Sequence, residues 1–140
     1  MFRQLDERML VSVQIAPEDV TEAAAQGVTM IVNNRPDGEQ PGQPAAAAIE
    51  AAAKAAGIAY RHIPVAGAFP PDAVAAMAEA LSAAGGGTTL AFCKSGTRSA
   101  YMWALARAQA GDDADRLIEQ AAGAGYDLSP LRPHLEARAG

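Results

Sequence analysis

The chain has 140 residues and a formal net charge of −5, and half of its residues are hydrophobic. This length is enough for one domain with a buried core and short for two, so we expect a single domain over residues 1–140. The acidic balance argues against a nucleic-acid partner, and no apolar run approaches the roughly 18 residues that span a bilayer, so we expect no membrane partner either.

The first ten residues carry charges of both signs and lack the continuous apolar stretch of a secretory signal, which predicts a cytoplasmic protein. After them, apolar β-branched runs alternate with alanine-rich segments, and glycines and prolines separate the two. The runs predict strands and the alanine-rich segments predict helices. In chain order we expect a strand over 10–14, a helix over 17–27, a strand over 28–33, a helix over 44–56, a strand over 58–65, a helix over 71–84, a strand over 88–92, and a helix over 99–110 with two shorter helices after it.

Strands that alternate with helices are typical of an α/β fold, here a three-layer sandwich around a mainly parallel sheet. In such folds, ligands bind at the carboxyl ends of the strands. Cys93, the only cysteine, directly follows the predicted strand 88–92. A single cysteine excludes an intrachain disulfide, and with only two histidines beside it we expect no metal site and no cofactor. Cys93 therefore acts as a single thiol.

The segment CKSGTRS joins this strand to the next predicted helix through a short loop. Its backbone N–H groups and the start of the helix attract an anion, and the Arg98 guanidinium adds a planar fork of donors. The same field favours the thiolate form of Cys93. A lone cysteine after a strand is often only a small core residue, but glycine and arginine at these positions favour catalysis. We predict that Cys93 and Arg98 are catalytic and that the substrate-binding residues are Lys94, Ser95, Gly96, Thr97 and Ser99, the last also as a helix N-cap.

The polar loop 34–42 follows the second predicted strand and contains two prolines and two glycines. Its simplest interpretation is a solvated turn in which Arg35 pairs with Asp37 or Glu39. The loop also leaves a strand at the sheet edge where we expect Cys93. In a second interpretation, Arg35 therefore helps to bind an anionic substrate, and Asp37 or Glu39 serves as a general acid.

The spacing C-x-x-G-x-R-S resembles the active-site loop of rhodanese-like sulfurtransferases, and also a shortened form of the cysteine phosphatase signature, C-x-x-G-x-x-R-[ST]. A wider resemblance is carried by the stretches 14–20, 27–28, 31–39, 62–65 and 93–99. Through them the whole chain is similar to the DUF442 family, the phosphatase-like domain of beta-lactamase hydrolase-like proteins, which is also described as a sulfur transferase. The resemblance implies a cysteine phosphatase-like fold, a cysteine nucleophile and a bacterial role in sulfide or persulfide handling.

Three departures from the phosphatase pattern favour chemistry on sulfur. The loop from Cys93 to Arg98 has six residues, the sulfurtransferase length, whereas the phosphatase loop has seven. Phe92 stands where phosphatases usually have a histidine, and residues 51–71 contain no acid that could protonate a leaving alkoxide. The nearest candidate, Asp72, lies at a helix start, where an acid has a structural reason. Persulfide transfer needs no such acid, because sulfur leaves as a stable anion.

We therefore predict a sulfurtransferase that takes the outer sulfur of thiosulfate or of a persulfide onto Cys93 and passes it to an external thiol acceptor. The alternative is a cysteine phosphatase that hydrolyses a phosphoester through a phosphocysteine, with Asp72 or Asp37 as general acid. A third possibility is a non-catalytic module that binds an anion or a persulfide, although a purely binding role could dispense with the thiol.

Overall fold

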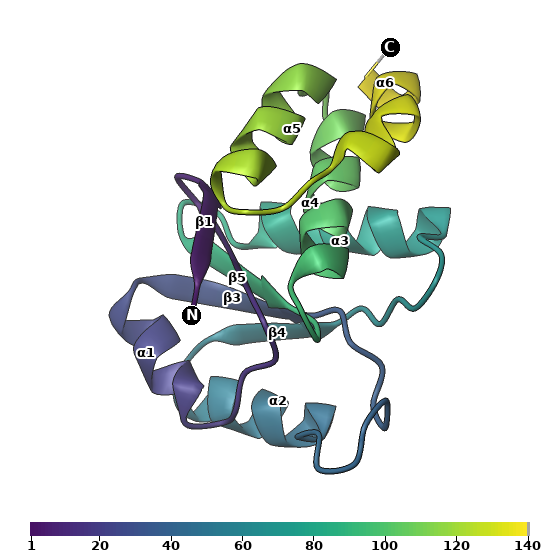
Figure 1. The fold of residues 1–140 in the computed structure, drawn as a ribbon. Coiled ribbons are helices and arrows are strands. Elements are labelled where there is room, and N and C mark those ends of the chain that lie inside the picture. The colour runs from purple at the N-terminus through teal and green to yellow at the C-terminus, as the bar shows by residue number, and fades with distance from the viewer. Residues whose placement is uncertain (140) are drawn as a thin grey trace.

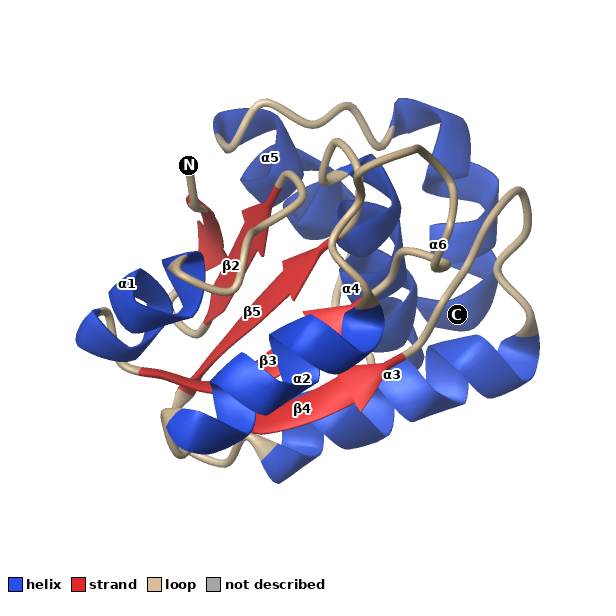
Figure 2. Ribbon diagram, turned by 90° about the horizontal axis from the view of Figure 1, so that it is seen from below, coloured by secondary structure: helices blue, strands red, loops and turns tan. Residues whose placement is uncertain are grey.

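Five strands form one sheet in the order β1-β2-β5-β3-β4 in the computed structural model, which describes residues 1–139. β2, β5, β3 and β4 are parallel, and β1 pairs with β2 in the antiparallel sense. The four parallel strands therefore end at one edge of the sheet (Figure 2). The strands are β1 (Arg3–Asp6), β2 (Met9–Ser12), β3 (Val28–Asn33), β4 (Ala59–His62) and β5 (Thr88–Phe92).

Helices cover both faces of the sheet and give the molecule three layers (Figure 1). Two helices lie on one face, α1 (Asp19–Ala25) and α2 (Ala46–Ala55). The other face carries α3 (Pro71–Ala83), α4 (Thr97–Gln109), α5 (Ala114–Gly123) and α6 (Arg132–Ala139), with the short 3-10 turn η1 (Ser129–Leu131) before α6.

Each face of the sheet has its own apolar core, because successive strand residues point to opposite faces. In β3, Ile31 belongs to the core under α1 and α2, whereas Met30 and Val32 belong to the core under the other four helices. All three side chains are buried, and so is Trp103 of α4. Burial of each such side chain stabilises the fold by roughly 1.5–3 kcal/mol, so the central strands form a firm base for the loops that follow them.

The helix α4 is the most enclosed of the six described helices, since most of its residues are buried. Its sequence explains this placement, because four buried alanines allow α3 and α6 to pack closely on either side of it. The helix begins directly after the Cys93 loop, so this packing fixes the first turn, in which Arg98 lies. The four alanines are Ala100, Ala104, Ala106 and Ala108.

The structure confirms the predicted α/β sandwich with its mainly parallel sheet. The sequence pattern does not predict β1, because RQLD contains one buried apolar residue, Leu5, and the strand forms by pairing with β2. The helix α4 starts two residues earlier than predicted, with Gly96 as its N-cap, so the prediction that Ser99 caps the helix is wrong. No helix among residues 1–139 is long and apolar enough to cross a bilayer.

Candidate active site

Cys93 lies directly after β5, at the centre of the sheet edge where the parallel strands end. Its side chain is buried, and its Sγ accepts a hydrogen bond of 3.1 Å from the backbone N–H of Gly96. The helix α4 starts at the next residue, so the partial positive charge of its N-terminus is directed at the loop. A backbone donor and a helix N-terminus are thus both directed at the sulfur of Cys93.

Position 96 of the loop requires a glycine for two reasons. Its φ angle is +94°, in the left-handed region that glycine adopts without strain. A Cβ atom at this position would also lie 2.2 Å from the hydroxyl oxygen of Tyr126. That hydroxyl makes a long contact of 3.5 Å to the carbonyl oxygen of Ser95, and burial raises the pKa of Tyr126. The segment after α5 therefore lies against the Cys93 loop and supports it.

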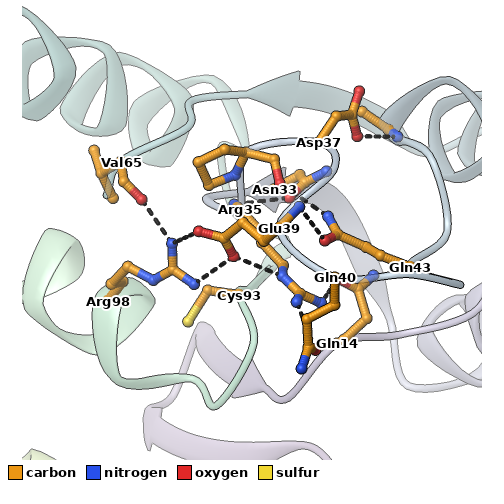
Figure 3. A network of polar contacts seen from close by, with 12 residues as sticks. Gln14, Asn33, Arg35, Asp37, Glu39, Gln40, Gln43, Val65, Cys93 and Arg98 are labelled. Carbon is orange, nitrogen blue, oxygen red and sulfur yellow. Dashed lines mark hydrogen bonds and ion pairs between the residues drawn. The ribbon is translucent and has the colours of Figure 1, made fainter. Parts of the chain in front are cut away.

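Arg98 is held by three hydrogen bonds (Figure 3). Its Nη1 donates to Glu39 Oε2 at 2.9 Å and to the carbonyl oxygen of Val65 at 2.8 Å, and its Nη2 donates to Glu39 Oε1 at 3.0 Å. The pairing with Glu39 raises the pKa of Arg98, and the charge of Cys93 raises it further. Arg98 and Cys93 are thus near enough to act on one substrate.

Arg35 lies on the loop after β3, and its side chain is only 3% exposed. Its Nε donates to Glu39 Oε1 at 2.8 Å. Its Nη1 and Nη2 donate to the side-chain oxygens of Gln14 and Gln40 at 3.1 and 2.9 Å. The guanidinium is therefore directed at other protein groups, and contact with a substrate would require one of these partners to move.

Glu39 joins the two arginines, and its carboxylate lies between their guanidinium groups (Figure 3). Hydrogen bonds from Arg98 and then from Arg35 lower the pKa of Glu39 to about 2. Glu39 is therefore ionised at neutral pH in this arrangement, and a carboxylate in that form cannot give a proton to a leaving group.

The remaining predicted binding residues differ in their surroundings. Lys94 is exposed, and so are Ser95 and Thr97, whose hydroxyls are hydrogen-bonded to each other at 3.2 Å. Ser99 is buried and donates from Oγ to Asn34 Oδ1 at 2.8 Å. This bond ties the start of α4 to the loop after β3. The structure thus brings all residues from 93 to 99 and Arg35 to one sheet edge, although only some of them face solvent.

Neither predicted general acid is hydrogen-bonded to the Cys93 loop among the residues that the structure describes. Asp37 Oδ1 accepts the backbone N–H of Ala46 at 2.8 Å and so caps the first residue of α2. Asp72 is exposed in the first turn of α3 and accepts the N–H of Ala73 at 3.0 Å. Both carboxylates therefore have structural roles at helix starts.

Asp37→Ala is expected to lower the free energy of unfolding by about 1 kcal/mol, because α2 loses its N-terminal acceptor, and to leave the activity of Cys93 unchanged. Urea unfolding and steady-state turnover measure the two effects. Asp72→Ala is the matched control, since it removes a carboxylate from another helix start. A loss of turnover in Asp37→Ala, restricted to substrates with poor leaving groups, would instead make Asp37 the acid.

The sequence does not single out several residues that complete the site. Gln14 follows β2 and Gln40 follows Glu39, and the side chains of both accept hydrogen bonds from Arg35. Asn34 accepts a hydrogen bond from Ser99 and donates one of 3.0 Å to the carbonyl oxygen of Ile63. Each comes from a polar stretch after a parallel strand, which is a usable signal in an α/β fold. Tyr126 has no such signal, because it lies in the C-terminal segment.

The family model and similar curated proteins point to the same group of relatives. Residues 1–110 match the family model described as beta-lactamase hydrolase-like protein, phosphatase-like domain. The beta-lactamase hydrolase-like protein of Xylella fastidiosa (strain 9a5c) is 35% identical over 136 residues, which are 96% of this chain and 32% of that protein. The chain thus spans about a third of the length of this curated relative.

Solved structures support the same relationship. A proposed phosphatase from Neisseria meningitidis Z2491 is 31% identical, with a TM-score of 0.83 and coverage of 97% of this chain and 96% of that one. PTPMT1 in complex with PI(5)P superposes with a TM-score of 0.76 over 99% of both chains at 15% identity. This second similarity shows the fold alone, which is that of the cysteine phosphatases.

Proposed function

Because the chain belongs to the family of the phosphatase-like domain of beta-lactamase hydrolase-like proteins, we propose that it is an enzyme whose Cys93 thiolate attacks a small anionic substrate bound by Arg98. The observation that carries the proposal is that Cys93 and Arg98 lie on the same loop at the start of α4. The Gly96 N–H, the start of α4 and the Arg98 guanidinium surround the sulfur of the only cysteine. A nucleophile and an anion-binding site thus lie within a few residues of each other.

The first candidate reaction is hydrolysis of a phosphomonoester. The Cys93 sulfur attacks phosphorus, an S–P bond forms, and the bond from phosphorus to the leaving oxygen breaks, with a proton reaching that oxygen from solvent or a nearby acid. Water then attacks the phosphocysteine and releases inorganic phosphate and the thiolate. The family description, the Neisseria structure and the phosphatase-like fold support this candidate better than they support sulfur transfer.

Sulfur transfer, which the sequence favours, is the second candidate. The Cys93 sulfur attacks the outer sulfur of thiosulfate, the S–S bond breaks and sulfite leaves, so that Cys93 carries a persulfide. An external thiol then takes the outer sulfur as its own persulfide, and the Cys93 thiolate returns. Two observations keep this candidate: the loop from Cys93 to Arg98 has six residues, and Glu39, the carboxylate nearest to Arg98, is ionised.

One experiment on the reduced protein separates the candidates. The intact mass is measured after brief exposure to thiosulfate or glutathione persulfide, and p-nitrophenyl phosphate turnover is measured on the same preparation. Protein alkylated with iodoacetamide serves as the control in both assays. Phosphoester cleavage that alkylation abolishes supports the first candidate, and a gain of one sulfur atom that cyanide reverses supports the second. If neither occurs, the enzyme proposal fails and a non-catalytic anion-binding module takes its place.

A further inference from the structure

The hydrogen bonds of Arg98 leave one edge of its guanidinium available. A guanidinium has five N–H groups. Both N–H groups of Nη1 are used, by Glu39 Oε2 and by the carbonyl oxygen of Val65, and one N–H of Nη2 donates to Glu39 Oε1. The Arg98 side chain also contacts the sulfur of Cys93, and among residues 1–139 no other group accepts a hydrogen bond from the Nε–H or from the second N–H of Nη2. These two lie on the same edge, which is the edge that binds two oxygens of an oxyanion side by side.

Glu39 therefore holds Arg98 by its outer end and does not take the edge that a substrate would need. The position of Glu39 is itself fixed, because Nε of the buried Arg35 donates to it at 2.8 Å. The backbone N–H of Arg35 in turn donates to Asn33 Oδ1 at 2.9 Å, at the end of β3. A chain of charge-assisted hydrogen bonds thus runs from the central sheet through Arg35 and Glu39 to Arg98.

We infer that Glu39 is a positioning residue, which orients Arg98 so that its Nε and Nη2 edge binds the oxyanion beside Cys93, with Arg35 holding Glu39 in place. The inference rests on the proposed function in one respect: it assumes that Arg98 binds a substrate oxyanion. It applies equally to a phosphoester and to thiosulfate, because both present two oxygens to the same edge.

A competing role for Glu39 makes the opposite prediction. If its carboxylate occupied the position of the substrate, its removal would free Arg98 and strengthen anion binding. If it positions Arg98, its removal weakens anion binding, because the long arginine side chain gains rotational freedom that binding must then remove. The direction of the change in anion affinity therefore distinguishes a positioning residue from a competitor.

The test is the protection of Cys93 from iodoacetamide by inorganic phosphate and by sulfate, followed through the rate of alkylation at neutral pH. In Glu39→Gln, an amide N–H₂ faces a guanidinium donor, and we expect the half-protecting phosphate concentration to rise by at least about tenfold. Glu79→Gln is the matched control, because Glu79 also pairs with an arginine, Arg61, but in a surface contact of 3.5 Å. It should change protection by less than about twofold.

Two further variants make the readout specific. In an Arg98→Lys background, Glu39→Gln should add less than about a twofold change, since a lysine has no second edge to orient. Glu39→Asp keeps the charge but is one methylene shorter, so we expect an intermediate loss, and it replaces Glu39→Gln if that variant does not fold.

Stronger protection in Glu39→Gln, unchanged protection, or no protection of the wild-type thiol by either anion would overturn the inference. None of these measurements uses turnover. A protein that is inactive on all substrates but shows the expected loss of protection would therefore contradict the proposed function and leave the role of Glu39 intact.

Discussion

Cys93→Ser is expected to abolish the activity of this protein, with a fall in kcat of roughly 10³-fold or more for phosphoester cleavage and no measurable sulfur uptake. A serine hydroxyl in the same position is not ionised near neutral pH, and the site has no neighbouring base hydrogen-bonded to it that would activate it. The groups that contact Cys93 Sγ by hydrogen bonds are the backbone N–H of Gly96 and the Arg98 guanidinium, and both are donors that cannot take up a proton. Stopped or continuous p-nitrophenyl phosphate assays and intact mass measure the two effects.

The same substitution should leave the fold intact, because serine is close to cysteine in size and its oxygen can also accept the Gly96 N–H. Thermal unfolding of Cys93→Ser is therefore the control. Activity that survives in Cys93→Ser would mean that a different residue is the nucleophile, and both candidate reactions would have to be abandoned.

Gly96→Ala is the second substitution from which we expect a large effect. Alanine would have to adopt a φ angle of +94°, and its Cβ would lie 2.2 Å from the Tyr126 hydroxyl oxygen, so the loop or the tyrosine must move. Together, the strained backbone and the steric overlap should lower the free energy of unfolding by about 3 kcal/mol. Displacement of the loop N–H groups should lower kcat/KM by roughly 100-fold.

Gly57 offers a matched comparison for this substitution. It has a φ angle of +74° after α2, but no heavy atom lies within 4 Å of the position its Cβ would take. Gly57→Ala should therefore cost only the backbone strain, about 1 kcal/mol, with no effect on activity. Urea unfolding measures the free energy of unfolding of both variants, and the difference between their losses is the contribution of the steric overlap at position 96. In a Gly96→Ala background, Tyr126→Ala should restore part of the activity; if it restores none, the tyrosine does not constrain the loop.

The sequence is sufficient to predict the fold class and the place of Cys93 within the fold. The β-branched run 88–92 and the glycine and arginine after Cys93 specify a strand, a loop and a helix through local preferences alone, and the structure has them there. The sequence does not predict β1, because a strand with one buried residue, Leu5, has no alternating apolar pattern. The strand forms through its pairing with β2, which is a tertiary contact.

The site itself is less predictable, because its contacts join segments far apart in the chain. Arg35 carries a charge that suggests substrate binding, and only the structure shows that its donors are taken by Glu39 and two glutamines. Likewise, the sequence predicts that Arg35 pairs with Asp37 or Glu39, and the structure has the pair with Glu39. The sequence does not predict the second pair of Glu39, with Arg98, 59 residues away. Local patterns specify which residues are polar, and packing decides which of them meet.

The contact between Tyr126 and Gly96 also bears on where this unit of structure ends. The match to the family model stops at residue 110, but the side chain that supports the Cys93 loop comes from residue 126, and Leu131 and Leu135 beyond it are buried in the same core. The unit that folds is therefore longer than the stretch that the family model covers. Anyone who transplants this module into another protein, or trims it for expression, needs to keep the segment through α6 together with the cysteine it supports.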